Sequence, residues 1–151
     1  MALRNIVKVG DDVLRKKCRP VTMIDPKIHQ LLDDMAQTMH EANGVGLAAP
    51  QVGLLKRIVV IDIGEGVIEL INPEIISASG SQTDDEGCLS VPGVYGYVTR
   101  PTWAKIRAQD RYGNWFEREG EGVVAQCFCH ETEHLDGHLF IEKVEEYVDV
   151  E

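Results

Sequence analysis

The chain has 151 residues, of which 44% are apolar and 26% are charged, so we expect a single domain over residues 1–151 with a substantial core. Its formal net charge of -10 argues against nucleic acid or an anionic membrane as the main partner. No apolar run approaches membrane-spanning length and the N-terminus does not resemble a signal peptide, so we expect a cytoplasmic location.

The four cysteines, Cys18, Cys88, Cys127 and Cys129, form no C-x-x-C pair, so neither a zinc knuckle nor a thioredoxin-type motif is available. In a reducing compartment we do not expect disulfides. Cys127 and Cys129 are predicted to be small buried residues, whereas Cys18 is predicted to be a loop thiol.

Residues 1–22 are predicted to form an arm with a turn, followed by an amphipathic helix that ends near residue 42. Asp25 is suited to the N-cap of this helix and Pro26 to its first position. Apolar residues then recur at helical spacing: Ile28, Leu31, Leu32, Met35 and Met39. Asn43-Gly44 suits a left-handed C-cap. His29 and His40 are interpreted as ordinary surface or hydrogen-bonded histidines and not as metal ligands.

The glycine-rich stretch 44–53 can be a simple turn between helix and strand. A phosphate-binding loop is disfavoured, because no lysine follows in the required position. Gly44 and Gly46 leave the backbone bare, so an extended peptide could approach and pair with it. Gln51 is the one side chain of the stretch able to donate hydrogen bonds to a developing oxyanion.

Several strands are predicted from short runs rich in β-branched residues with turn residues between them. The predicted strands are 57–63, 67–73, 74–79, 97–100, 102–110 and 115–120, with breaks at 64–66 and at Asn72-Pro73 and a turn at 112–114. With one helix before these strands and one after, the pattern favours an α+β fold. We expect mostly antiparallel strands packed around a buried C-terminal helix.

That helix carries the motif H-E-x-x-H at His130, Glu131 and His134. Residues four apart lie about 40° apart around a helix, so both imidazoles can reach one metal ion. Glu131 points beside the metal, where a carboxylate can take a proton from water. The preceding residues 123–129 are mostly apolar or small, which favours a buried helix, although the motif alone can arise by chance.

Cys88 lies between glycine and leucine after three acids, in a segment at 84–92 that we expect to be a loop. It is either a half-exposed loop thiol or a third metal ligand, which would leave the fourth position open as in catalytic zinc sites. Histidine ligands usually donate their second N–H to an acceptor. Glu86 is the first candidate acceptor, followed by Asp85 and Asp136.

Three segments, GVGLAAPQ at 44–51, EGCLS at 86–90 and HETEHLDG at 130–137, resemble the three motifs of peptide deformylase, and the resemblance extends over essentially the whole chain. It implies a metallohydrolase that removes the formyl group from N-formylmethionyl nascent peptides. By match, Cys88, His130 and His134 resemble the metal ligands and Glu131 the general base and acid. Gln51 and the Leu89 N–H resemble the oxyanion hole. The expected cofactor is one divalent ion, Fe²⁺ first, with Zn²⁺ or Ni²⁺ able to replace it.

The expected substrate-binding residues supply bare backbone or apolar walls: Gly44, Val45, Gly46, Gly87, Val123 and Cys127. Two residues depart from the family pattern, Cys129 where Gln is common and Glu133 where Asp is common. The resemblance also implies contact with the ribosome through a basic C-terminal helix. The acidic character of the segment after Gly137 weakens that expectation.

Two other classes of protein remain open from the sequence. A metallopeptidase that cuts internal bonds shares H-E-x-x-H but usually takes its third ligand downstream, where Asp136 and His138 are among the few donors. A catalytically silent adaptor could keep the metal for stability alone. The presence of both Glu131 and Gln51 argues against the adaptor, because a structural metal site needs neither.

Overall fold

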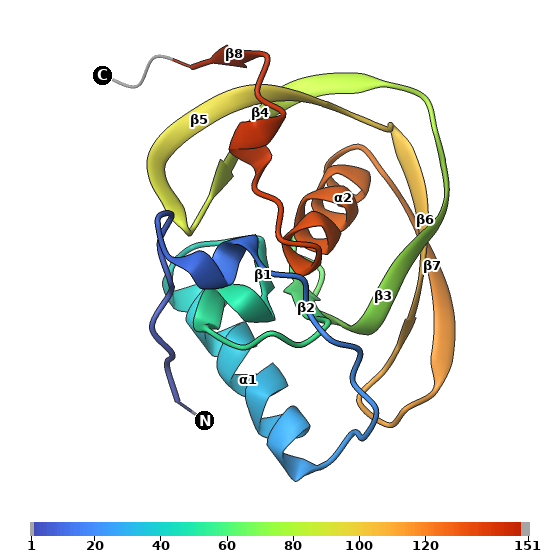
Figure 1. Ribbon diagram of the computed structural model, residues 1–151. Coiled ribbons are helices and arrows are strands. Elements are labelled where there is room, and N and C mark those ends of the chain that lie inside the picture. The colour runs from blue at the N-terminus through green and yellow to red at the C-terminus, as the bar shows by residue number, and fades with distance from the viewer. Residues whose placement is uncertain (1, 149–151) are drawn as a thin grey trace.

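The computed structural model describes residues 2–148, which form two antiparallel sheets and two α-helices (Figure 1). The elements in chain order are η1 (Asp12–Arg15), α1 (Pro26–Glu41), β1 (Gly46–Ala48), η2 (Ala49–Val52), β2 (Ile58–Ile61), β3 (Ile68–Ser79), β4 (Gln82–Cys88), β5 (Val91–Arg100), β6 (Trp103–Gln109), β7 (Trp115–Glu121), α2 (Val123–Leu135), η3 (Phe140–Glu142) and β8 (Glu146–Tyr147). The sheet orders are β1-β2-β3-β6-β7 and β4-β5-β8. The predicted α+β class and both predicted helices are confirmed.

Helix α2 lies inside the arc that the long strands make around it (Figure 1). Its side chains Ala125, Phe128 and Leu135 pack in one cluster with residues of β2, β3 and β6. The prediction of a buried helix is confirmed for most of its length. It is wrong for Val123, which is 51% exposed because the first turn reaches the surface.

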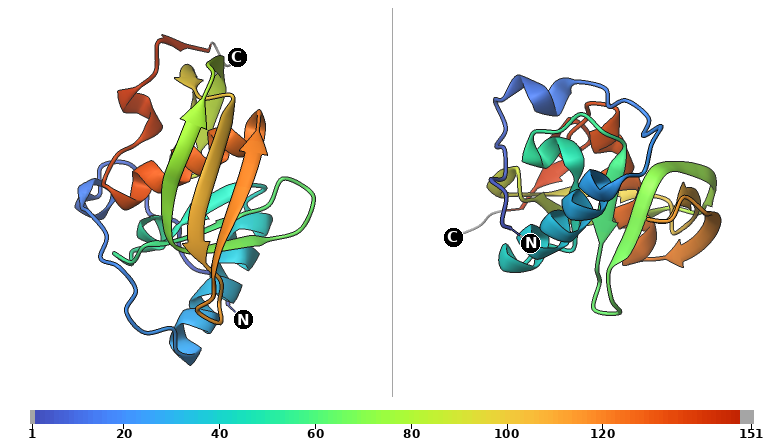
Figure 2. Two further views of the ribbon diagram at one scale, coloured as in Figure 1. Left: turned by 90° about the vertical axis from the view of Figure 1, so that its right-hand side faces the viewer. Right: turned by 90° about the horizontal axis from the view of Figure 1, so that it is seen from below.

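Strand β2 is apolar throughout because it lies between two helices. Val59 and Ile61 belong to the cluster around α2, whereas Ile58 and Val60 belong to the cluster around α1. Alternate residues of a strand point to opposite faces, so a strand covered on both faces must be continuously apolar. Figure 2 shows α1 along the side of the molecule away from the long strands.

The ends of α1 follow the predicted signals. The Asp25 carboxylate accepts the Ile28 N–H at 3.0 Å, and Pro26 begins the helix. Beyond the last turn Asn43 takes a left-handed conformation with φ of 58°. These local capping contacts explain why both boundaries could be predicted.

Two strand predictions were wrong. Asn72-Pro73 does not break the strand, because β3 runs through it with a bulge between Ile71 and Glu74. Asn72 has a φ of 52°, and its side chain bonds both the N–H and the carbonyl of Val21, which stabilises the irregular backbone. The expected loop at 84–92 is instead the β4–β5 hairpin, turning at Leu89-Ser90.

Cys18 lies in a loop as predicted, but it is 4% exposed and packs in the cluster around α2. Its N–H donates to the Leu135 carbonyl at 2.7 Å, which joins the arm to the end of α2. Burial raises the pKa of its thiol to about 11. Within residues 2–148, no helix has the length and apolar character needed to cross a membrane.

Candidate metal and catalytic site

Cys88, His130 and His134 come together at the end of β4 and along one face of α2. One donor atom of each lies within 4.8 Å of the others. The Cys88 sulfur lies 3.4 Å from His134 Nε2, and the two imidazole centroids are 5.0 Å apart. One thiolate and two imidazoles this close suit a divalent transition metal and leave a fourth position open.

A buried carboxylate orients the first of these histidines. His130 Nδ1 lies 2.9 Å from Glu86 Oε1, so the opposite ring nitrogen is directed toward Cys88 and His134. Burial alone would raise the pKa of Glu86, but hydrogen bonds and charges from His130 and Arg100 outweigh it and hold the pKa at about 2. Glu86 was the first predicted acceptor, and this prediction is confirmed. Asp136 instead pairs with Arg57 at 3.0 Å.

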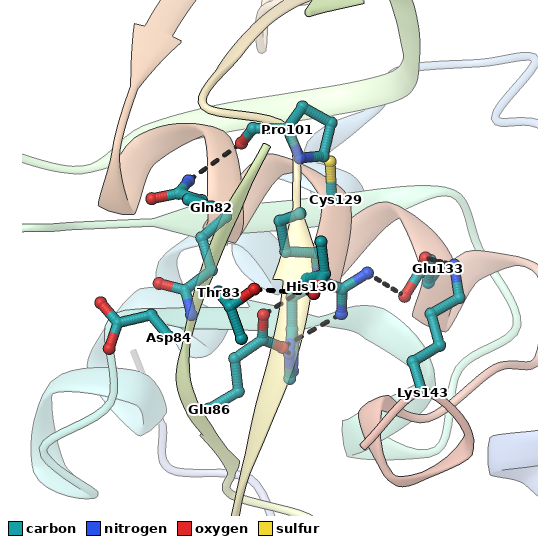
Figure 3. Close-up of polar contacts among 12 residues, drawn as sticks. Gln82, Thr83, Asp84, Glu86, Pro101, Cys129, His130, Glu133 and Lys143 are labelled. Carbon is teal, nitrogen blue, oxygen red and sulfur yellow. Dashed lines mark hydrogen bonds and ion pairs between the residues drawn. The ribbon is translucent and has the colours of Figure 1, made fainter. Parts of the chain in front are cut away.

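Arg100 extends this contact into a buried network. Its guanidinium binds both oxygens of Glu86, at 2.9 and 3.0 Å, and Glu133 at 2.7 Å. Lys143 binds the other oxygen of Glu133 at 2.6 Å, as Figure 3 shows beside His130 and Glu86. Glu133, one of the two departures noted from the sequence, therefore joins α2 to the segment that follows it.

His134 differs from His130 in having no such acceptor. It is 1% exposed, and in the part of the chain that the structure describes its Nδ1 has no hydrogen-bond partner. Burial lowers the pKa of His134 well below its usual range, which favours the neutral imidazole that metals bind.

Glu131 lies beside the three donors and is 5% exposed. Its Oε2 is 3.9 Å from His130 Nε2, and its Oε1 is buried without a partner among residues 2–148. Burial raises the pKa of its carboxyl to about 7, against the opposing charge of His130. A carboxyl group with a pKa near neutrality can both accept and return a proton.

Gln51 is held so that its amide nitrogen faces the same site. Its Oε1 accepts the Ala48 N–H at 2.9 Å, and its Nε2 donates to Ser90 Oγ at 3.1 Å and to Cys88 Sγ at 3.4 Å. Ser90 is fully buried and was not a predicted site residue. Ser90 has no distinguishing sequence pattern, because its contact with Gln51 joins residues 39 positions apart in the chain.

A cavity of about 490 Å³ opens in front of these groups. It is lined by every candidate substrate-binding residue and by most candidate catalytic and metal residues: Gly44, Val45, Gly46, Gly87, Val123, Cys127, Gln51, Leu89, Glu131, Cys88 and His130. His134 is not among the lining residues. Tyr95 and Gln126 line the cavity but were not predicted. Tyr95 lies in the part of β5 that was not predicted as strand, whereas Gln126 lies on the predicted helix four residues before His130, and this helical spacing could have identified it.

A family model described as polypeptide deformylase matches residues 3–149. The chain belongs to the polypeptide deformylase family. The peptide deformylase of Agathobacter rectalis is 64% identical over 145 residues, covering 96% of this chain and 92% of the relative. That of Caldicellulosiruptor bescii is 59% identical over 151 residues, covering 100% of this chain and 91% of the relative.

Solved structures of the family have the same fold. The Thermotoga maritima peptide deformylase superposes with a TM-score of 0.93 at 40% identity, covering 95% of this chain and 98% of that one. A Synechococcus elongatus peptide deformylase in complex with actinonin superposes with a TM-score of 0.92 at 41% identity, covering 95% of this chain and 79% of that one. Polypeptide deformylases are metal-dependent hydrolases, so the predicted enzyme class is confirmed and the internal peptidase and the silent adaptor are set aside.

Proposed function

We propose that this chain, acting as a single domain over residues 1–151, removes the formyl group from N-terminal formylmethionine of new polypeptides and releases formate. The observation that carries the proposal is the cluster of Cys88, His130 and His134 donors within 4.8 Å, beside a cavity that also presents Glu131 and Gln51. The resemblance favours Fe²⁺ as the ion on these three residues, while the donor set is also suited to Zn²⁺ and Ni²⁺.

A divalent ion on these side chains would lower the pKa of a water molecule and polarise the formyl oxygen. Glu131 then accepts the proton of the attacking water on its unpartnered oxygen and delivers it to the leaving amine. Because the carboxyl is buried and its pKa lies near 7, both directions of transfer are accessible at neutral pH.

Two donors are proposed to stabilise the negative charge that develops on the formyl oxygen. The Gln51 amide and the Leu89 N–H would bind the formyl oxygen, and one such donor is typically worth a factor of about 10² to 10³ in rate. The Ala48 N–H binds Gln51 Oε1 and so fixes the amide with its nitrogen toward the site.

An extended peptide can reach these groups between two strand edges. In the described part of the chain, β1 and β4 are each terminal strands of their sheets, and Gly44, Gly46 and Gly87 line the cavity. Val45, Val123 and Cys127 line the same cavity and would contact the methionine side chain. Nascent peptides are made in the cytoplasm, where the proposal places the enzyme. Any contact with the ribosome must overcome the net charge of -10.

Formate release from short formyl-Met peptides tests the proposal. The protein is prepared anaerobically, loaded with Fe²⁺ or Ni²⁺, and incubated with formyl-Met and acetyl-Met forms of one peptide. We expect rapid formate release and much slower turnover of the acetyl peptide, because its extra methyl group overlaps the tight site. Internal fragments without formate, or no turnover despite a filled metal site, would contradict the proposal.

A further inference from the structure

Residues 6–9 of the N-terminal arm connect the two segments that carry the proposed oxyanion donors. The Val7 N–H donates to the Gln51 carbonyl, and the Val9 N–H donates to the Ser90 carbonyl, both at 2.7 Å. Alternate residues of an extended chain present their N–H groups on the same side, which allows one short segment to make both bonds. In Figure 1 the arm runs past α1 toward the turn between β4 and β5.

The two segments joined in this way belong to different parts of the fold. Gln51 lies in η2, directly after β1 of the five-stranded sheet, while Leu89 and Ser90 form the β4–β5 turn of the three-stranded sheet. Between them the Gln51 Nε2 donates to Ser90 Oγ at 3.1 Å. The arm closes a ring of hydrogen bonds that runs from Val7 through Gln51 and Ser90 to Val9.

The arm is itself fixed at its start. The Ala2 N–H donates to Asp34 Oδ1 at 2.8 Å, and the Arg4 N–H donates to Thr38 Oγ1 at 2.9 Å, both on α1. The Arg4 guanidinium adds an ion pair with Asp34 at 2.9 Å. An arm anchored on α1 can hold the separation of η2 and the β4–β5 turn, rather than merely following their movements.

We propose that residues 6–9 are a positioning segment, which sets the distance between the Gln51 amide and the Leu89 N–H. This inference rests on the proposed function. Oxyanion donors act mainly in the transition state, and misplacement by about 1 Å can cost a factor of about 10² in rate. Loss of either arm bond should therefore lower kcat, while KM and metal content stay unchanged.

The test removes single hydrogen-bond donors and keeps every side chain. Cys18 permits native ligation of a synthetic segment 1–17 to recombinant residues 18–151, which gives the full chain. Backbone amide-to-ester replacement at Val7 or at Val9 deletes one N–H and weakens the preceding carbonyl as an acceptor, which for Val9 is the Lys8 carbonyl that accepts the Asp11 N–H at 3.2 Å. The matched control is the ester at Lys8, whose N–H has no acceptor among residues 2–148.

We expect kcat on a formyl-Met peptide to fall about 10-fold or more for the Val7 and Val9 esters relative to the Lys8 ester, with KM within about twofold. The Zn²⁺ forms, with only residues 18–151 labelled with ¹⁵N, report on the site independently of activity. Faster exchange of the Leu89 amide and altered Gln51 side-chain signals are expected in the same two variants.

An unchanged kcat, or unchanged Leu89 and Gln51 signals, in both variants would overturn the inference. An unmodified ligated chain that holds its metal and does not release formate would instead count against the proposed function. The nuclear magnetic resonance comparison still decides the positioning role in that case.

Discussion

Glu131 occupies the same helix turn as the two histidines, yet its carboxylate has one oxygen without a partner among residues 2–148. An amide of the same shape can fill this place but cannot take up a proton. Glu131→Gln should therefore retain its metal and lose about 10²-fold or more in kcat. Metal content and turnover measured on one preparation separate the two roles. A Glu131→Gln enzyme with normal turnover would show that the proton passes elsewhere.

The four cysteines differ in what surrounds them, and this predicts which one binds metal. Burial raises the pKa of Cys127 to about 12 and that of Cys18 to about 11, so both stay protonated. Cys88 instead lies 3.4 Å from a histidine nitrogen. Cys88→Ala should strip most of the metal, whereas Cys127→Ala and Cys129→Ala should keep about one ion per chain. Elemental analysis of the three purified variants decides it, and full metal in Cys88→Ala would remove Cys88 from the ligand set.

At the level of the element, strand β1 begins at a glycine, Gly46, beside which the Glu131 carboxylate lies. A Cβ at Gly46 would lie 2.5 Å from the Glu131 carboxylate oxygen, whereas a Cβ at Gly44 would meet only the flexible end of Leu89, at 2.7 Å. Gly46→Ala should therefore displace Glu131 and lower kcat about 10²-fold with the metal retained, while Gly44→Ala should have a much smaller effect. Steady-state kinetics of the two variants make the comparison. Equal losses in both would mean that bare backbone, and not room for Glu131, is what matters.

The pairing of β4 with β5 places Glu86 against Arg100, and this ion pair makes the stability of the folded chain depend on pH. The Glu86 pKa of about 2 lies below its ordinary value of 4.5, so the unfolded chain takes up the proton first as pH falls. The ionised Glu86 carboxylate contributes about 3 kcal/mol to the free energy of unfolding. This contribution is fully present above pH 4.5 and is lost as the pH falls toward 2. Glu86→Gln should be less stable than the parent at pH 7, with a difference that shrinks by pH 3. Urea unfolding of both metal-free proteins across this range tests the sign.

Features that depend on residues close together in the sequence could be predicted. These are the caps of α1, the buried apolar run of β2 and the helical spacing of His130 and His134. Strand β4 was missed because its acids lie on an exposed edge, and only Glu86 turns inward to Arg100, fourteen positions away. Ser90 and the arm bonds of Val7 and Val9 were missed for the same reason, since they exist only once two sheets and the arm meet.

For the whole molecule, the three proposed metal donors also connect the two sheets through α2. Cys88 ends β4 of one sheet, while α2 packs on β2, β3 and β6 of the other. A metal bound across these parts stabilises the folded chain alone, because the unfolded chain does not hold the three donors together. Binding at a free metal concentration 100 times the Kd adds about 2.7 kcal/mol.

Removal of the metal should therefore lower the unfolding midpoint by roughly 5 to 10 °C, given a shift of about 2 to 4 °C per kcal/mol for a chain of this size. Thermal unfolding of chelated protein, followed by reloading with Zn²⁺ or Ni²⁺, measures the difference. Cys88→Ala is the matched control and should show no response to either treatment. Glu131→Gln should respond like the parent chain, because its carboxyl group is not needed to hold the ion. A midpoint that does not move on chelation would mean that the three donors do not hold the sheets together through a metal.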